Sequence, residues 1–153
     1  MRIADFAAVE LIVTGLDAPA KDALLAEMVG LLVRAGHVQH SEILMGELLK
    51  RERVMSTGIG GGIALPHALS DELDQLYMVF ARTAQPIDFA ALDAQPVDLI
   101  FMLVGPKAAG NMYVKLLARI SRLLQAEEFK ARLRGSATPE DILNVFQSED
   151  VES

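Results

Sequence analysis

The residues best suited to chemistry lie between positions 56 and 68, where the chain reads STGIGGGIALPHA. Four glycines fall within five residues of this stretch: Gly58, Gly60, Gly61 and Gly62. A loop so rich in glycine can turn its backbone N–H groups toward an anion. Pro66 then fixes the backbone directly before His67, whose imidazole could act as a nucleophile or a base near neutral pH. A glycine turn followed by a core strand, with His67 as an ordinary half-buried side chain, explains the same residue types equally well.

Cations precede this stretch at the end of an amphipathic segment. Residues 41–53 place apolar side chains at helical spacing, and Ser41 is a suitable N-cap. Arg51 and Arg53 then lie in the last turn, where positive charge suits the helix dipole. From residue types alone, Arg51 is therefore a solvated helix end.

The other histidines do not predict a metal site. His37 and His40 are three residues apart in a polar connection, with no thiolate or carboxylate pattern beside them. The chain has no cysteine, which fits a reducing compartment and excludes disulfides. We predict neither a metal nor a cofactor, and we expect His37 and His40 to face solvent.

Composition limits the class of protein. The chain has 153 residues, of which 52% are hydrophobic, so it can bury one sizeable core, and we predict a single domain over residues 1–153. Its net charge of −7 would repel nucleic acid and anionic membrane surfaces. No apolar run is long enough for a membrane span, and the first residues do not read as a signal peptide. We therefore expect a cytoplasmic protein that is not inserted in a membrane.

The segments that must hold His67 alternate between strand and helix patterns. Residues 76–83 and 97–104 are nearly continuous apolar runs, typical of central strands buried on both faces. Residues 85–89 read as a loop, Asp17 as a helix cap, and residues 148–153 as a frayed acidic tail. Further patterns predict strands at 10–16 and 63–65, and helices at 20–34, 41–53, 111–125, 127–134 and from 139 onward. This order predicts an α/β fold in which helices cover both faces of a mixed sheet of about five strands.

The order of several motifs resembles the type 2 IIA domains of the bacterial phosphotransferase system, which comprise fructose, mannitol and nitrogen-regulatory IIA proteins. Glu52 precedes Ile59-Gly60 and Ile63-Ala64-Leu65-Pro66-His67-Ala68 at the spacing of the family's phosphohistidine signature. Over roughly 130 residues, further matches follow in order. They are Arg51-Glu52, Ser56-Thr57-Gly58, Pro86-Ile87-Asp88-Phe89, Pro96-Val97-Asp98-Leu99-Ile100 and Leu116-Leu117-Ala118-Arg119-Ile120-Ser121.

The resemblance implies a mixed five-stranded sheet and a phosphoryl carrier that needs no metal or cofactor. His67 would accept phosphate from the phosphocarrier protein HPr or its nitrogen-branch equivalent. It would pass the phosphate to a cysteine of a IIB domain, or use it to regulate a transporter or kinase. Arg51 matches the family arginine that lies close to the phosphorylated histidine, and its guanidinium could hold two phosphoryl oxygens.

The glycine loop could supply the remaining contacts to the phosphoryl group. We assign phosphate binding to Gly60, Gly61 and Gly62 and to the hydroxyls of Ser56 and Thr57. Capping or turn stabilisation is the competing role for at least one of these two hydroxyls.

Tyr113 departs from the family pattern, because a second histidine occupies this position in the family. A tyrosine can donate a hydrogen bond but is not a cation at neutral pH. The alternative function is therefore a regulatory binding module of the same fold that is phosphorylated poorly. A hydrolase with His67 as its base ranks last, since no nucleophile or carboxylate pair has an informative spacing. With no transporter helices and no IIB cysteine in the sequence, we favour the nitrogen-regulatory branch.

Overall fold

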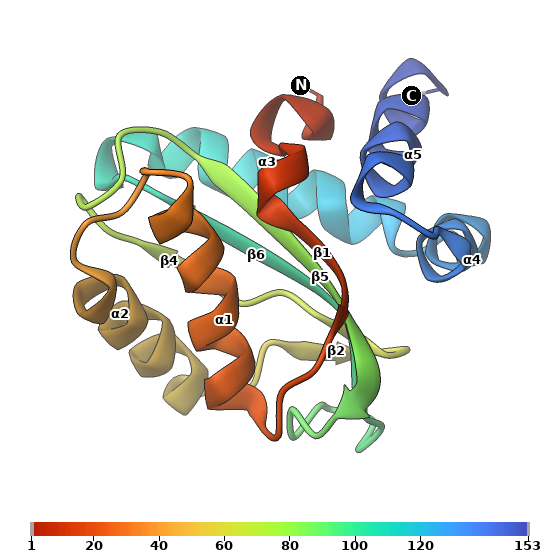
Figure 1. Cartoon of the computed structure of the whole chain (residues 1–153), viewed down its shortest axis with the longest axis horizontal. Helices are drawn as coiled ribbons and strands as arrows, with labels where there is room; N and C mark the ends of the chain where they lie inside the picture. The colour runs from red at the N-terminus through yellow and green to blue at the C-terminus, as the bar shows by residue number, and fades with distance from the viewer. Residues whose placement is uncertain (1, 153) are drawn as a thin grey trace.

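A mixed sheet of six strands forms the middle layer of the protein (Figure 1), as seen in a computed structural model that describes residues 2–152. The strand order is β1-β5-β6-β3-β2. Strand β4 also pairs with β6, further along that strand than β3 does. The strands are β1 Ile12–Leu16, β2 Gly58–Gly60, β3 Ile63–Ala64, β4 His67–Leu69, β5 Tyr77–Ile87 and β6 Val97–Gly105. The neighbours β1·β5, β3·β6 and β4·β6 are parallel, and β2·β3 and β5·β6 are antiparallel.

The two central strands are β5 and β6, which are the two continuous apolar runs of the sequence. Their antiparallel register places Phe80 opposite Phe101, and these rings meet edge to face with centroids 5.0 Å apart. Alternate side chains of each strand enter separate core clusters above and below the sheet. This burial on both faces explains why neither strand alternates between polar and apolar residues.

Helices cover both faces of this sheet, so the predicted fold class is confirmed. Helices α1 (Lys21–Arg34) and α2 (Ser41–Val54) pack on one face and lie in front of it in Figure 1. The other face is covered by α3 (Gly110–Leu123), α4 (Glu127–Gly135) and α5 (Pro139–Glu152), together with the 3-10 turn Ile3–Phe6.

The sixth strand arises at Pro66. Strands β3 and β4 both pair with β6, with Ile63 opposite Leu99 and His67 opposite Leu103. Pro66 lies between them and has no N–H to donate, but its carbonyl still accepts a hydrogen bond from Leu103 N–H at 3.0 Å. The strand predicted at 63–65 is therefore β3, and His67 opens a further strand at the sheet edge, β4, which the sequence pattern did not predict.

Four local predictions differ from the structure. Ser41 is the first residue of α2 and does not cap it, because the N-cap is His40. Asp17 does not cap α1, whose N-cap is Ala20. Pro86 belongs to β5 at a register irregularity, where a strand tolerates a residue without an N–H. The tail is helical through Glu152 because the Asp150 carboxylate accepts the N–H groups of Ile3 and Ala4 at 2.9 and 3.0 Å. Ser153 lies outside the described residues.

The helices bear on the membrane prediction as well. No helix within residues 2–152 has both the length and the apolar character that are needed to cross a bilayer.

Candidate functional site

His67 lines a cavity of about 370 Å³ at the sheet edge, where elements from both helical layers meet β4. Helix α2 contributes its last two turns, and α3 contributes its first turn. The lining residues are Glu47, Lys50, Arg51, Val54, His67, Ala68, Leu69 and Tyr113. The structure therefore brings together the predicted residues His67, Arg51 and Tyr113.

The imidazole of His67 is held by one backbone contact. Its Nδ1 lies 2.7 Å from the carbonyl oxygen of Leu65. A carbonyl can only accept, so Nδ1 carries the proton and donates it in this contact. In the neutral ring Nε2 then keeps its lone pair, which makes Nε2 the nucleophilic atom.

The surroundings of His67 favour this neutral ring. Burial lowers the pKa of His67 below 6.5, the Leu65 carbonyl opposes this shift, Arg51 lowers the pKa further and Glu52 raises it. The net direction is downward. More of the imidazole is therefore unprotonated at neutral pH than in an exposed histidine.

This lowered pKa leads to a prediction about pH. In the folded protein His67 should titrate below about 6.5, the value expected for the unfolded chain. Because the unfolded state then binds more protons, the contribution of His67 to stability is present above pH 6.5 and is lost as pH falls through the folded pKa. We expect an NMR titration of the His67 ring to show this in native protein, with the chain in urea as control. A native midpoint at or above the urea value would contradict the prediction.

Arg51 has a structural contact as well as a place in the cavity. Its Nη1 donates to the carbonyl of Met55 at 2.8 Å and so satisfies a carbonyl just beyond the end of α2. Its charge also acts on both His67 and Tyr113. The guanidinium has five N–H donors. Within residues 2–152 this contact is the one hydrogen bond of the Arg51 side chain, so most of its guanidinium donors remain for a ligand.

Tyr113 lies beside His67, with the two ring centroids 5.8 Å apart and the planes tilted by 59°. Burial raises the pKa of Tyr113 to about 12, and the charge of Arg51 opposes this. The phenol is thus neutral at physiological pH and can offer a hydrogen bond, but not a charge.

Ser56 and Thr57 make their contacts to protein groups rather than to the cavity. Ser56 Oγ donates to Phe89 O at 2.5 Å and accepts the N–H of Gly58 at 3.0 Å. Thr57 is buried, and its hydroxyl donates to the carboxylate of Glu52. Both hydroxyls hold the loop in shape, which was the competing interpretation of their role.

The structure does not bring the glycines Gly60, Gly61 and Gly62 to His67. They form the turn between β2 and β3, next to Asp98, whereas His67 lies opposite Leu103 on the same neighbouring strand. Five residues of β6 span roughly 16 Å. The N–H of Gly61 donates to Asp93 Oδ2 at 3.0 Å, so this donor is occupied.

Backbone geometry explains these glycines without a ligand. Gly60, Gly61 and Gly62 all have positive φ, at 99°, 65° and 82°. A Cβ at position 62 would lie 2.6 Å from Arg134 Nη2 and 2.7 Å from Asp98 Oδ1. The turn therefore needs glycine for its conformation, and a side chain at position 62 would also displace the ends of the Asp98 and Arg134 side chains.

Sequence reasoning missed three residues that α2 contributes to the cavity. Glu47, Lys50 and Val54 line it together with Arg51. Positions three or four apart share one helix face, so spacing from Arg51 would have identified Glu47 and Val54. Lys50 adds a second cation from the adjacent position.

The remaining histidines lie away from this cavity. His37 stacks on Tyr77 with centroids 4.1 Å apart, and His40 is exposed at the start of α2. In the described part of the chain, no three residues of the His, Cys, Asp and Glu types are grouped as metal ligands.

Comparisons with known proteins agree in fold and sequence. Residues 5–149 match the family model described as "Phosphoenolpyruvate-dependent sugar phosphotransferase system, EIIA 2". A "Nitrogen regulatory protein" of Bradyrhizobium diazoefficiens is 37% identical over 148 residues, which cover 95% of each chain. The crystal structure of nitrogen regulatory protein IIA-Ntr from Neisseria meningitidis superposes with a TM-score of 0.88 at 27% identity, covering 94% of this chain and 98% of that one.

A second similar structure is a complex. It is that of enzyme IIAMTL and phosphorylated enzyme IIBMTL from Escherichia coli, with a TM-score of 0.77 at 20% identity and coverage of 92% and 96%. At this identity the likeness concerns the fold.

Proposed function

We propose, from the premise that this chain belongs to the type 2 EIIA family of the phosphoenolpyruvate-dependent sugar phosphotransferase system, that Nε2 of His67 accepts a phosphoryl group and passes it on. The observation that carries this proposal is the contact between Nδ1 and the Leu65 carbonyl. This contact fixes the proton on Nδ1 and leaves the lone pair on Nε2. A phosphoryl acceptor needs this unprotonated nitrogen at neutral pH.

The transfer step follows from this geometry. Nε2 attacks the phosphorus of a phosphohistidine on an HPr-type carrier, and the N–P bond of the donor breaks with its electron pair left on the donor imidazole. The proton on Nδ1 stays in place, so the His67 ring gains positive charge as its own N–P bond forms. The Leu65 carbonyl stabilises that charge through the same hydrogen bond.

The charge on the transferred phosphoryl group needs cations and donors at its equatorial oxygens. Arg51 supplies a planar fork for two oxygens, and Lys50 adds a point charge at the rim. The neutral hydroxyl of Tyr113 supplies one further hydrogen bond. The glycine turn is not needed for this step, and phosphate binding at Gly60, Gly61 and Gly62 remains a separate prediction.

The surface around the cavity suits a protein partner. Val54, which lines it, is 80% exposed, and the residues on either side of Tyr113 in the sequence, Met112 and Val114, are 44% and 63% exposed. A second cavity adjoins it through Glu47 and Leu69, and its polar lining is Ser70, Asp71, Glu72 and Lys107. We assign this apolar and charged surface to the HPr-type donor, and also to a IIB domain or a regulated transporter or kinase as the receiving partner. The complex of a similar IIA protein with a phosphorylated IIB protein supports the second assignment.

We place the protein in the nitrogen-regulatory branch. The similarity to nitrogen regulatory proteins of Bradyrhizobium diazoefficiens and Neisseria meningitidis supports this assignment. The test compares phosphorylated HPr from a sugar system with its nitrogen-branch equivalent as donors. Faster phosphorylation by the nitrogen-branch carrier is expected, and a clear preference for the sugar carrier would overturn the assignment.

The second candidate function is a binding module that is phosphorylated poorly. It is favoured by Tyr113, a neutral side chain at the position of the family's second histidine. In that case docking of the unmodified protein to a transporter or kinase would be its activity.

Variants of Tyr113 separate the two functions. If the hydroxyl donates to the phosphoryl group, Tyr113→Phe should slow phosphorylation about tenfold, since a hydrogen bond to a charged group contributes roughly 1.5–3 kcal/mol. Rapid-quench transfer from a phosphorylated carrier measures this rate. A nearly inert wild type that Tyr113→His activates would instead support the binding module. Equal rates for all three proteins would exclude Tyr113 from the reaction.

A further inference from the structure

Glu52 is a buried carboxylate that neither contacts the transferred phosphoryl group nor lines the His67 cavity. It lies in the last turn of α2, and its side chain is only 5% exposed. Its carboxylate accepts the ammonium of Lys21 at 3.0 Å, the N–H of Thr57 at 3.2 Å and the hydroxyl of Thr57. Burying a carboxylate is costly unless it is paired and hydrogen-bonded in this way.

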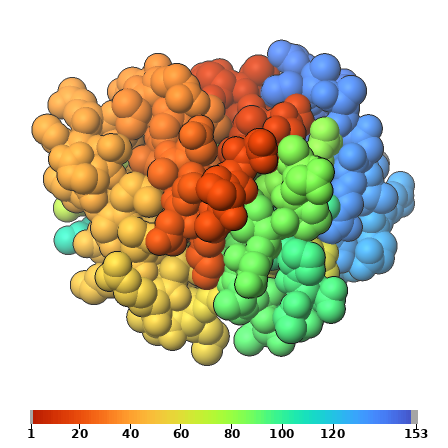
Figure 2. Space-filling model, turned by 60° about the horizontal axis from the view of Figure 1, so that its bottom comes forward, coloured from red at the N-terminus to blue at the C-terminus, as the bar shows by residue number. Residues whose placement is uncertain are grey.

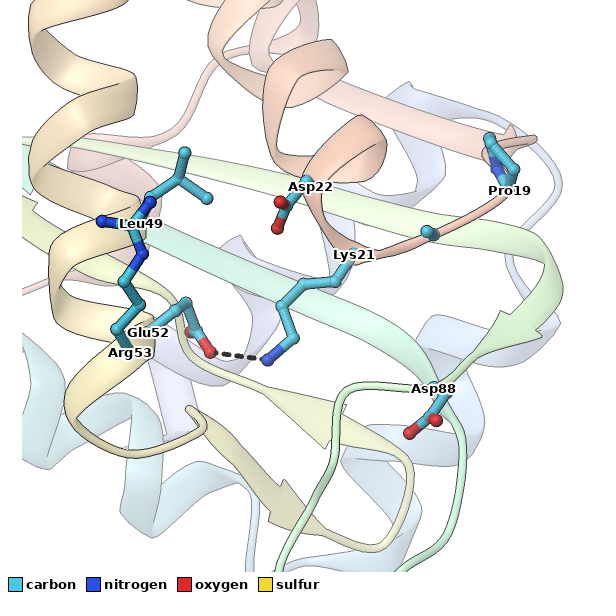
Figure 3. A pocket seen from close by; sticks show the side chains of 8 residues that line it. Pro19, Lys21, Asp22, Leu49, Glu52, Arg53 and Asp88 are labelled. Atoms are coloured by element: carbon cyan, nitrogen blue, oxygen red, sulfur yellow. Dashed lines mark hydrogen bonds and ion pairs between the residues drawn. The ribbon is translucent and has the colours of Figure 1, made fainter.

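Figure 3 shows the ion pair between Lys21 and Glu52 at a cavity of about 510 Å³, distinct from the one at His67. The Lys21 ammonium also lies 4.9 Å from the centroid of the Phe89 ring. Phe89 O in turn accepts the hydroxyl of Ser56. The segments around these residues, near 56–60 in yellow and 85–95 in green, lie side by side in Figure 2, and Leu92 N–H donates to Gly58 O at 3.3 Å. Glu52 is therefore held by Lys21 from α1 and by Thr57 from the segment that follows α2.

A chain of hydrogen bonds leads from Glu52 to the reactive ring. Glu52 fixes Thr57 through both its N–H and its hydroxyl. The carbonyl of Thr57 accepts the N–H of Leu65 at 2.9 Å. The carbonyl of Leu65 accepts Nδ1–H of His67 at 2.7 Å. Each link joins two groups of well-defined direction, so the orientation of the imidazole depends on the position of Thr57.

The charge of Glu52 reaches the same ring. It acts on His67 in the sense that favours a positive imidazole, against the effect of Arg51. This matters for the reaction because the ring gains positive charge as the N–P bond forms. Glu52 thus bears on both the tautomer of the ground state and the charge of the transition state.

We infer that Glu52 is a positioning residue for phosphoryl transfer: acting through Thr57 and Leu65, it holds His67 in the tautomer that presents Nε2 to the donor. This inference rests on the proposed function. Lys21 is the counter-ion that permits the carboxylate to stay charged in its buried place.

The test uses two near-isosteric variants and one control in the full-length chain. Glu52→Gln removes the charge and replaces one acceptor oxygen by a donor. Thr57→Val removes the hydroxyl but keeps the backbone groups of position 57. Glu42→Gln removes the same charge from an exposed position of α2, where Glu42 is 75% exposed, and is the control for net charge.

Two readouts distinguish positioning from stability. The first is the ¹⁵N shifts of the His67 ring, which report the tautomer without any phosphorylation and remain informative if the proposed function fails. The second is the split between kcat and KM for transfer from a phosphorylated carrier. Glu52 is buried and does not touch the carrier, so Glu52→Gln should lower kcat about tenfold, the scale of a lost hydrogen bond to a charged group, with little change in KM.

The expected result is a mixed tautomer of His67 and a lowered kcat in both variants, with both readouts unchanged in Glu42→Gln. Unchanged ring ¹⁵N shifts in the folded variants would overturn the inference, even with slower transfer, because Glu52 would then not set the tautomer of His67. If Glu52→Gln does not fold, Thr57→Val decides: native ring shifts and native kcat in that variant would assign Glu52 to the fold.

Discussion

The variant His67→Ala is expected to take up no phosphoryl group from a phosphorylated HPr-type carrier, whereas the wild type takes up one. The reason is that, of His37, His40 and His67, only His67 lines the cavity between α2 and α3, and its Nδ1 is engaged by the Leu65 carbonyl, which leaves Nε2 to react. The measurement is intact-protein mass after incubation, before and after mild acid, because a phosphorylated histidine loses its phosphate in acid. His40→Ala is the matched control, since His40 is exposed at the start of α2.

The fold should tolerate this change. His67 opens an edge strand that pairs with β6 through its backbone, and the core clusters do not include the imidazole. We therefore expect a circular dichroism spectrum like that of the wild type. Acid-labile phosphate that persists in folded His67→Ala would show that another residue is the acceptor.

The second large effect is expected at Arg51. Loss of a preorganised donor to a charged transition state slows catalysis by about 10²–10³-fold in well-studied enzymes. Arg51→Ala should approach this range, and Arg51→Lys should recover only part of the rate, because an ammonium keeps the charge but not the planar fork. Rapid-quench transfer rates for the two variants and the wild type measure this order.

Thermal unfolding separates the role of Arg51 in transfer from its role in stabilising the end of α2. Arg51 also bonds the carbonyl of Met55, so Arg51→Ala should lose a modest amount of stability, about 0.5–1.5 kcal/mol for one hydrogen bond. Arg53→Ala is the matched control from the same turn, since Arg53 does not line the His67 cavity. Equal transfer rates for Arg51→Ala and Arg53→Ala would assign Arg51 to the helix end alone.

The sequence was most informative where the local pattern and the physical requirement coincide. The continuous apolar runs became β5 and β6 because strands at the centre of a sheet are buried on both faces. Pro66 marked the interruption before His67 because a residue without an N–H disturbs the ladder of any strand. The resemblance then supplied Arg51 and Tyr113, which the structure places beside His67.

The glycines illustrate what sequence cannot decide. A turn with positive φ and a loop that cradles an anion both need glycine, so Gly60, Gly61 and Gly62 fit either interpretation. The difference lies in Asp93 and Arg134, which contact this turn from segments far along the chain. No local pattern reports such partners.

Glu52 was visible in the sequence only as a member of a motif. Its place became clear through Lys21, a residue 31 positions earlier, and through the hydrogen bonds that lead to His67. The prediction of a frayed tail was wrong for the same reason. The end of α5 is held by Asp150, whose carboxylate accepts the N–H groups of Ile3 and Ala4 from the other end of the chain.

The measurement that tests the central claim most directly is heteronuclear NMR of the phosphorylated protein. It reads the phosphorus–nitrogen coupling and the ¹⁵N shifts of the His67 ring in one sample. We predict a single coupling to Nε2, with the proton retained on Nδ1 in its hydrogen bond to Leu65. A phosphorus coupled to Nδ1, or to a nitrogen of His37 or His40, would contradict the claim.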